Sequence, residues 1–423
     1  MGSSLPLVDL DGTHPGGRGL GGHGSGQDAH ERRERHSRHL ALPGIGMGGQ
    51  SRIDQARVLV IGAGGLGSPV LQYLAAAGIG TLGIVDDDAV DLSNLQRQTI
   101  HGTPDVGRPK TSSAADSVHR TDPGIEVVEH AERLTADNAI RILSGYDVVV
   151  DATDNFATRY LISDAAALVG VPCVWGSVYR WDAQVTVFWD AAPDGRGIDY
   201  RDVFPEPPAD GAVLSCEEAG VFGAVCGTVG ALMATEVIKL VTGAGTPLVG
   251  RVVVLDALAG TSRTIGVKRA KGRQRVTALA DYDLFCGVGA ATDGTELDAE
   301  EVERILASDE EVVLLDVREP DERLVDSIPG HVAVPVRIVT VDPGAVPGAI
   351  TDRVVVYCAS GVRSRAAAAA LREAGRDAVS LRGGIQAWRS VAGRAGRAPL
   401  TPGRSPASTT PRSSSSPPTR SRP

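Results

Sequence analysis

The chain has 423 residues, of which 42% are hydrophobic and 4% aromatic, and its formal net charge is −10. This length allows two or three domains with sizeable buried cores. The stretch from Val391 to Pro423 holds six Arg and no acidic residue, so the preceding body is more acidic than the total suggests. An acidic body argues against a nucleic-acid groove, which needs a basic stripe.

Cysteine usage and apolar runs indicate the compartment. Five cysteines, at 173, 216, 226, 286 and 358, are too few and too scattered for a disulfide framework. The N-terminus lacks the basic and apolar regions of a secretory signal. The longest uncharged run, Ala219–Thr235, has 17 residues with four Gly and predicts a buried helix, not a membrane span. We therefore expect a soluble cytoplasmic protein that binds no membrane.

The first half of the chain alternates strands and helices. Residues 1–28 are Gly-rich and polar, which predicts disorder. From Arg57, β-branched runs such as VLVIGAG and DVVVDAT are separated by helical patterns, near Ser68 onward, Lys110–Arg120 and Ala136–Ser144. This order predicts right-handed crossovers and a Rossmann-like, doubly wound α/β sheet with helices on both faces.

Further elements complete a first domain over residues 29–290. Two strands with an antiparallel look, VPCVWGSVYR and AQVTVFWD, precede a proline-rich loop, the long helix Val221–Val241 and the strand RVVVLDA. A linker is expected at 291–298. A second, smaller α/β domain then covers 299–392, and the Pro/Ser/Arg-rich tail 393–423 is expected to be disordered.

A glycine-rich turn follows the first strand, in VLVIGAGGLG at residues 58–67. It matches the dinucleotide fingerprint G-x-G-x-x-G, with the acidic residue Asp86 about twenty positions on. Gly62, Gly64 and Gly67 supply a tight turn, close approach to phosphate and close helix–strand packing. Asp86 can accept hydrogen bonds from ribose hydroxyls. Taken alone, this pattern favours a nicotinamide dinucleotide.

Three charged side chains beyond the fingerprint favour a triphosphate. Arg97 and Lys110 follow the strand that ends at Asp86, and Asp154 follows the next strand end, in DVVVDATDN. Hydride transfer has no use for two cations there. Cleavage of an α–β phosphate bond does, because negative charge accumulates on the departing pyrophosphate. A carboxylate at this strand end, where Asp151 and Asp154 lie, could hold Mg²⁺ against the phosphates.

Five stretches resemble the ubiquitin-activating-type adenylyltransferases of the MoeB/ThiF family over about residues 30–290. They are VLVIGAGGLGSPVLQYLAAAGIG, VDDDAVDLSNLQRQ, VGRPK, DATDNFATRY and FPEPP. The resemblance implies adenylation, with ATP and Mg²⁺, of the C-terminal glycine of a ubiquitin-like sulfur carrier (MoaD/ThiS-like, ending Gly-Gly). It also implies a nucleotide site made by Gly62, Gly64, Gly65, Gly67, Asp86, Ser93, Asn94, Arg97, Lys110, Asp154 and Asn155. In RHSRHL, Arg38 matches an arginine that reaches the partner subunit's ATP, which implies a homodimer.

Many members of this family carry a structural zinc held by two CxxC pairs. Those positions are DYRD (199–202) and Asp283–Cys286 here, so one thiol of four remains. Carboxylates replace soft thiolate ligands of zinc poorly, and we expect no structural zinc. In this the sequence is most similar to the actinobacterial MoeZ branch of the family. We expect aromatic packing to hold the two loops, by Tyr200, Tyr282 and Phe285.

A second reactive loop lies in VVVYCASGVRSRAAAAALREAG (354–375). Backbone N–H groups and a helix N-terminus beside Cys358, with Arg363 closing the loop, stabilise a thiolate. Four residues separate Cys358 from Arg363, which is one fewer than separate the cysteine and arginine of a phosphatase loop. Together with VVLLDVREPDE, SIPGHVAVPV and LRGGIQAW, the loop resembles a rhodanese domain. The resemblance implies that Cys358 carries a persulfide, drawn from thiosulfate or a cysteine desulfurase.

The remaining thiols differ in expected role. Cys216 lies in a loop that enters a helix, where the family has a cysteine proposed to capture the carrier covalently, and a structural role is the alternative. Cys173 and Cys226 are expected in the core.

The leading hypothesis joins two half-reactions, adenylation and sulfur transfer, that yield a carrier thiocarboxylate for molybdopterin, thiamine or related sulfur insertion. Two alternatives stay open. One is an NAD(P)-binding Rossmann oxidoreductase with an appended domain, for which only His101 and His119 follow the fingerprint as acid/base candidates. The other is a non-enzymatic scaffold for ubiquitin-like partners.

Overall fold

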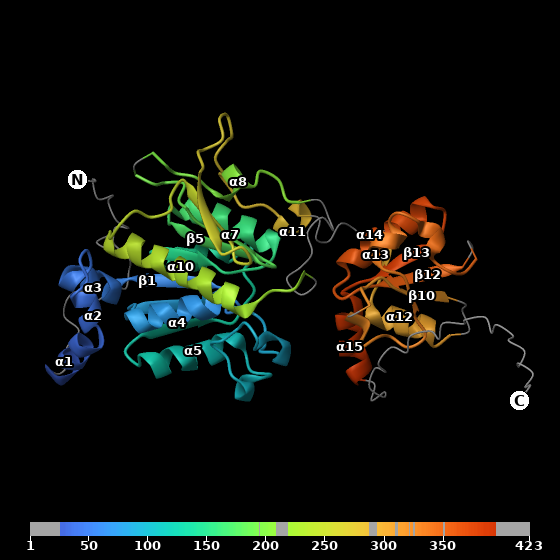
Figure 1. Cartoon of the computed structure of the whole chain (residues 1–423), viewed down its shortest axis with the longest axis horizontal. Helices are drawn as coiled ribbons and strands as arrows, with labels where there is room; N and C mark the ends of the chain where they lie inside the picture. Colours follow the sequence, from blue (N-terminus) through green and yellow to red (C-terminus); the bar gives the residue numbers. More distant parts are fainter. Residues whose placement is uncertain are drawn as a thin grey trace, which may run out of the picture. The chain divides into compact units, whose positions relative to one another are not determined.

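The computed structural model describes residues 26–193, 195–208, 219–286, 294–308, 312–320, 322–324, 326–349 and 352–394. The chain divides into two compact units, Met1–Ala290 and Ala291–Pro423 (Figure 1). Cys216 and most of the two expected tails lie outside the described residues.

The first unit is built on an eight-stranded sheet in the order β3-β2-β1-β4-β5-β6-β7-β8. The strands are β1 (Arg57–Ile61), β2 (Thr81–Val85), β3 (Glu126–His130), β4 (Val148–Asp151), β5 (Cys173–Tyr179), β6 (Asp182–Phe188), β7 (Arg251–Asp256) and β8 (Thr261–Gly266). Strands β1 to β5 are parallel and β6 to β8 continue antiparallel. The two strands expected to be antiparallel, β5 and β6, do pair antiparallel, and β5 also pairs parallel with β4.

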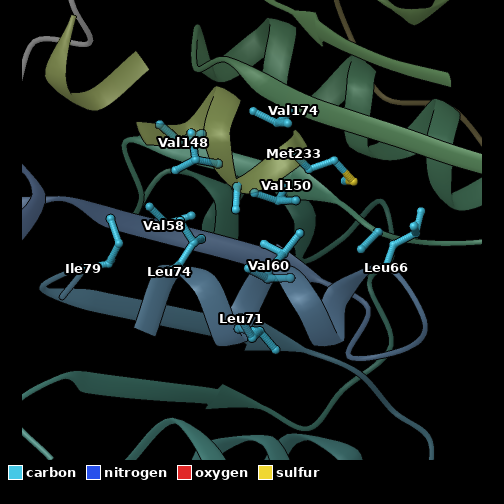
Figure 2. Packing of buried hydrophobic residues seen from close by; sticks show 14 of the residues in the cluster. Val58, Val60, Leu66, Leu71, Leu74, Ile79, Val148, Val150, Val174 and Met233 are labelled. Atoms are coloured by element: carbon cyan, nitrogen blue, oxygen red, sulfur yellow. The ribbon is translucent and has the colours of Figure 1, made fainter. Parts of the chain in front are cut away.

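Helices cover both faces of this sheet, which confirms the doubly wound architecture. They are α1 (Gly26–Arg35), α2 (Ser37–Leu40), α3 (Gly46–Gln55), α4 (Gly67–Ala77), α5 (Lys110–Thr121), α6 (Ala139–Leu143), α7 (Phe156–Val169), α8 (Tyr200–Val203), α10 (Gly223–Thr242) and α11 (Tyr282–Phe285). One core joins alternate residues of β1 and β4 to α4 and α10. Figure 2 shows Leu74 of α4 beside Val58 of β1. The other core packs the opposite residues against α6 and α7.

Two helices bear on the sequence expectations. α1 begins at Gly26, inside the stretch 1–28 that was expected to be disordered. Its last turn is held by long-range contacts, since Arg35 Nη1 donates to the Thr121 carbonyl at 2.6 Å. α10 is the one helix in the described part that is long and apolar enough to cross a membrane. Ten of its residues are buried, and it packs on α4 and β5, as expected of a core helix.

The second unit holds a five-stranded parallel sheet in the order β11-β10-β12-β13-β9. Its strands are β9 (Glu296–Leu297), β10 (Val312–Asp316), β11 (Val332–Ala333), β12 (Arg353–Tyr357) and β13 (Ala378–Leu381); its helices are α12 (Ala299–Leu306), α13 (Val336–Val339), α14 (Val362–Glu373) and α15 (Gly384–Arg394). β9 lies inside the expected linker 291–298. Backbone bonds to Thr295 and Leu297 attach it to β13, so the sheet begins earlier than predicted.

Candidate active sites

The glycine-rich turn joins β1 to α4 at the point where the strand order reverses. β2 and β3 lie on one side of β1, and β4 and β5 on the other, so a crevice opens at the carboxyl ends of β1 and β4. Gly62 has a left-handed φ of +92°. A Cβ at Gly67 would lie 1.8 Å from the Gly62 carbonyl oxygen, so only glycine lets α4 start this close to the strand.

A cavity of about 300 Å³ lies at this crevice, and most of the predicted nucleotide residues line it. Those that do are Gly62, Gly64, Gly65, Asp86, Arg97, Lys110, Asp154 and Asn155. Gly67, Ser93, Asn94 and Arg38 are not among the lining residues. The structure therefore brings eight sequence-predicted residues from five separate segments into one site.

Asp86 directly follows β2 and is held by backbone groups of the turn and of its own segment. Its carboxylate accepts the backbone N–H groups of Ala63 at 2.8 Å and of Asp88 at 2.9 Å. Burial raises the pKa of Asp86, although Lys110 and these two N–H groups act in the opposite direction. The carboxylate is thus oriented beside the glycine turn, where a ribose hydroxyl can donate to it.

Lys110 enters the cavity from the first residue of α5. An antiparallel bridge between Ala89 and Pro109, and a bond from Lys110 N to the Asp88 carbonyl at 2.9 Å, fold its segment back onto the end of β2. The side chain is 8% exposed, and Nζ lies 2.7 Å from Asp88 Oδ2. A phosphate group that enters this site has to compete with Asp88 for that ammonium.

Arg97 is carried by the turn η1 (Leu92–Asn94). Asp91 caps the turn by accepting from Ser93 N and Oγ, at 2.8 and 2.6 Å, and Asn94 Oδ1 accepts from Asp91 N. Arg97 N in turn donates to the Asn94 carbonyl. In this structure Ser93 and Asn94 build the turn that presents Arg97, and they do not face the cavity.

The end of β4 contributes the last predicted pair. Asp154 is exposed and lines the cavity. Asn155 also lines it, but its Oδ1 caps α7 by accepting from Thr158 N at 2.9 Å. A compact group of three carboxylates, Asp86, Asp87 and Asp88, also lines this cavity. Asp86 is already engaged by backbone N–H groups and Asp88 by Lys110, so Asp154 is less encumbered than either of them as a ligand for a phosphate-bound cation.

Sequence reasoning missed several lining residues. Arg159 of α7 is buried under the Thr153–Asp154 segment and donates from Nη2 to the Thr153 carbonyl at 3.0 Å. Gln98 is also buried and lines the cavity beside Arg97. Cys226 of α10 belongs to the core, as predicted, and also reaches the cavity beside Gly65. Gln98 and Arg159 lie in stretches that carried the family resemblance, which is the signal that could have found them.

His101 supports the glycine turn from behind. Its ring nitrogens lie 3.0 Å from the Ala63 carbonyl oxygen and 2.8 Å from Ser113 Oγ. Neither His101 nor His119 is among the residues that line the cavity, so the oxidoreductase alternative lacks its acid/base group there.

Arg38 lies on α2 and is exposed. Its neighbour His36 is buried, and His39 Nδ1 lies 3.0 Å from Gln50 Oε1 of α3. These contacts hold α2 in place, and the Arg38 side chain is exposed on its surface.

Arginine and aromatic groups occupy the region of the expected zinc loops. Arg273 pairs with Asp199 and, at 2.9 Å, with Asp202. Burial acts to raise the pKa of Asp202, but bonds from Arg273 and from backbone N–H groups outweigh it and lower that pKa. Tyr282 donates to Asp164 at 2.8 Å, and Asp164 also pairs with Arg201 at 2.8 Å.

The predicted aromatic packing is present in the same region. Tyr160 has ring contacts with Tyr200 at 4.9 Å and with Phe285 at 5.2 Å, and Tyr282 belongs to the same core. The carboxylates of Asp199 and Asp202, at two of the positions expected for zinc thiols, are therefore neutralised by a guanidinium. Such carboxylates do not provide the soft thiolate ligands that a structural zinc ion needs.

Cys358 lies in the second unit, between β12 and α14, and is fully buried. Gly361 N donates to its Sγ at 3.1 Å, and Ser364 Oγ lies 3.6 Å from the same sulfur. Both contacts stabilise a thiolate. Arg363 forms a two-bond ion pair with Glu322, with both N···O distances 2.7 Å. The loop is also held from α15, where Ile385 N donates to the Cys358 carbonyl at 2.9 Å.

Comparisons with known proteins agree with this geometry. The model of the ThiF family matches residues 36–276, and that of the rhodanese-like domain matches residues 298–391. The protein named "Probable adenylyltransferase/sulfurtransferase MoeZ" of Mycobacterium tuberculosis is 50% identical over 360 residues, which are 84% of this chain and 92% of that protein. The sulfur carrier protein adenylyltransferase of Thermus thermophilus is 46% identical over 265 residues, which are 61% of this chain and 98% of that protein.

Among solved structures, E. coli MccB has the same fold as the first unit. Its TM-score is 0.52 at 20% identity, over 58% of this chain and 74% of that one. The chain belongs to the ThiF family and, with its rhodanese-like domain, is an enzyme of the adenylyltransferase/sulfurtransferase type.

Proposed function

We propose that the first unit adenylates the C-terminal glycine of a ubiquitin-like sulfur carrier ending Gly-Gly. The observation that carries this is the convergence of Asp86, Arg97 and Lys110 on one cavity with the glycine turn. The turn and Asp86 suit phosphate and ribose, and two cations suit a departing pyrophosphate. The sulfur carrier in the name of the Thermus relative supports the choice of substrate.

In this reaction the carrier carboxylate attacks the α-phosphorus of ATP. A carboxyl O–P bond forms, the bond from the α-phosphorus to the bridging oxygen breaks, and pyrophosphate leaves with that electron pair. A carboxylate is already a nucleophile, so no general base is needed, and the chain supplies alignment and charge neutralisation. Mg²⁺ bound by Asp154 would add Lewis-acid stabilisation of the phosphates.

We further propose that Cys358 delivers sulfur as a persulfide. Its terminal sulfur attacks the acyl-adenylate carbonyl and displaces AMP, which leaves the carrier joined to Cys358 through a disulfide. A reducing thiol then cleaves that S–S bond and releases the carrier thiocarboxylate. This thiol attacks Cys358 Sγ, so the thiocarboxylate leaves with the electron pair of the S–S bond and Cys358 remains in a mixed disulfide with the thiol. A second thiol reduces that mixed disulfide, and the N–H of Gly361 and the hydroxyl of Ser364 stabilise the Cys358 thiolate that leaves in this last step. Thiosulfate or a cysteine desulfurase is the proposed donor.

Several finer points belong to the same proposal. The protein acts as a homodimer in the cytoplasm, with Arg38 of each subunit reaching the ATP of the other. The pairs of Arg273 with Asp199 and Asp202 stand in for a structural zinc. Cys216, outside the described residues, is a candidate thiol for capture of the carrier. The product serves molybdopterin, thiamine or related sulfur insertion.

Carrier-dependent exchange of radiolabelled pyrophosphate into ATP tests the first step. Exchange is expected only when the carrier, ATP and Mg²⁺ are all present. Absence of exchange with every cognate Gly-Gly carrier would contradict the proposal, and so would exchange that does not depend on the carrier.

A further inference from the structure

Gln98 has an unsatisfied polar atom at the nucleotide cavity. The residue is 4% exposed and lines the cavity beside Arg97. Its Oε1 is buried and has no hydrogen-bond partner in the described part of the chain. A buried amide oxygen without a donor is costly, so such an atom at a substrate cavity indicates a donor on the ligand.

The position of Gln98 shows which end of the ligand it meets. Its Nε2 lies 3.5 Å from the place where a Cβ on Gly64 would stand, directly beside the turn that receives the phosphates. A Cβ on the next glycine, Gly65, would likewise lie close to Arg97 and to the Cys226 sulfur. The amide therefore lies at the reacting end of the cavity.

ATP has no donor at that end. Its phosphate oxygens are acceptors, and its hydroxyl and amino donors belong to the ribose and adenine. The ribose hydroxyls can donate to Asp86, whose carboxylate is held in place by the backbone N–H groups of Ala63 and Asp88. The second substrate does bring a donor. A carrier that presents its terminal carboxylate to the α-phosphorus also presents the N–H of its last peptide bond, one residue's length from the reacting oxygen.

We propose that Gln98 recognises the last peptide group of the carrier. Oε1 accepts the N–H of the C-terminal glycine, and Nε2 donates to an oxygen of the carboxylate or of the α-phosphate. One rigid amide thus ties the end of the carrier to the reacting phosphate, which aligns the attack. This inference rests on the proposed adenylation and makes Gln98 a substrate-binding residue for it.

The test uses a MoaD/ThiS-like carrier prepared by semisynthesis with either glycine or N-methylglycine as its last residue. The methyl group removes only the N–H that Oε1 is proposed to accept. We compare the wild-type chain, Gln98→Ala, and the matched control Gln96→Ala, whose side chain is exposed two residues away. Each is assayed by carrier-dependent pyrophosphate exchange, and ATP affinity is measured separately without carrier.

With wild type and Gln96→Ala, the methylated carrier is expected to lose about tenfold or more in kcat/KM, since a buried acceptor is left unpaired. Gln98→Ala should be slower with the glycine carrier and lose less than twofold on methylation. Its ATP affinity should fall by less than its rate of exchange, and the retained ATP binding shows that the site is folded.

Three results would overturn the inference. An equal methylation loss in wild type and Gln98→Ala would mean that the amide does not meet this N–H. A fall in ATP affinity as large as the fall in exchange would make Gln98 a nucleotide ligand. If the wild-type chain exchanges nothing with glycine-ending carriers, the proposed function itself fails and this inference with it.

Discussion

Arg97 reaches the cavity from a capped turn and, with Lys110, is one of two predicted cations there. Lys110 is already paired with Asp88 at 2.7 Å, so Arg97 should supply much of the charge that the departing pyrophosphate needs. Arg97→Ala should lower pyrophosphate exchange on the order of 100-fold, as for loss of one preorganised donor. Arg120→Ala, at the exposed end of α5, is the control and should exchange like wild type. Near-normal exchange by Arg97→Ala would place the phosphates elsewhere.

Cys358 is the nucleophile of the second unit in the proposed reaction. Cys358→Ala should abolish sulfur transfer from thiosulfate and leave pyrophosphate exchange within twofold of wild type, because the two residue sets belong to separate compact units. Thiosulfate sulfurtransferase and exchange assays on the same preparation measure both. Surviving sulfur transfer would show that another thiol carries the persulfide.

His101 links stability to pH. Burial is the main cause that lowers its pKa below the ordinary value of 6.5. Below pH 6.5 the unfolded histidine gains a proton that the folded one does not, so the free energy of unfolding should fall as pH falls from 6.5 toward the lowered pKa. Burial lowers the pKa values of His36 and His130 in the same direction.

Denaturant unfolding between pH 5 and about 8 measures this slope. His101→Gln should remove its share of the slope, whereas His119→Gln, at an exposed position of α5, should leave the slope unchanged. An identical slope in wild type and His101→Gln would contradict the assignment.

At the scale of elements, the loop at residues 199–202, one of the two expected to correspond to a zinc site, is held by Arg273. Its partners Asp199 and Asp202 have side chains that are 3% and 0% exposed. Arg273→Ala leaves both carboxylates buried without their cation and should destabilise the first unit by about 3 kcal/mol. Thermal unfolding measures this. A strong zinc chelator should leave the Tm of wild type unchanged, and a chelator-induced drop would show that a metal is bound there after all.

Long periodic elements were predictable from sequence and short ones were not. The start of α5 at Lys110 and of α12 at Ala299 agree with the predicted helices, because each is long enough to show a period. α8, β9 and α11 have two to four residues and show none. α8 lies next to Asp199, whose partner Arg273 is 74 residues away in sequence, and no local pattern reveals such a pair.

At the scale of the whole molecule, the order of strands determined what could be foreseen of the site. Gly62, Asp86, Lys110 and Asp154 come from different segments, yet they were predicted together because parallel strands bring their carboxyl ends to one edge. The sequence did not predict the ion-pair partners that the fold brings together, such as Glu322, which pairs with Arg363 from 41 residues away. These depend on tertiary packing, which neither spacing nor composition records.

The division into two units, with the cut between Ala290 and Ala291, gives the last prediction. If the units perform successive half-reactions, their covalent link sets an effective concentration of about millimolar for short flexible linkers. A chain cut at this point and mixed at micromolar concentration should keep pyrophosphate exchange in the first piece and thiosulfate sulfurtransfer in the second. Formation of carrier thiocarboxylate, followed by mass spectrometry of the carrier, should fall at least about tenfold relative to the intact chain.

Raising the second piece toward millimolar concentration should restore thiocarboxylate formation, because the cut chain then differs from the intact one only in how often the two units meet. The assays of the separate pieces are the control for folding, since each piece has its own activity to report. Equal thiocarboxylate rates for the cut and intact chains at micromolar concentration would show that the link contributes nothing. In that case the persulfide unit finds the acyl adenylate by binding and not by tethering, and an interface between the pieces should be measurable by titration calorimetry.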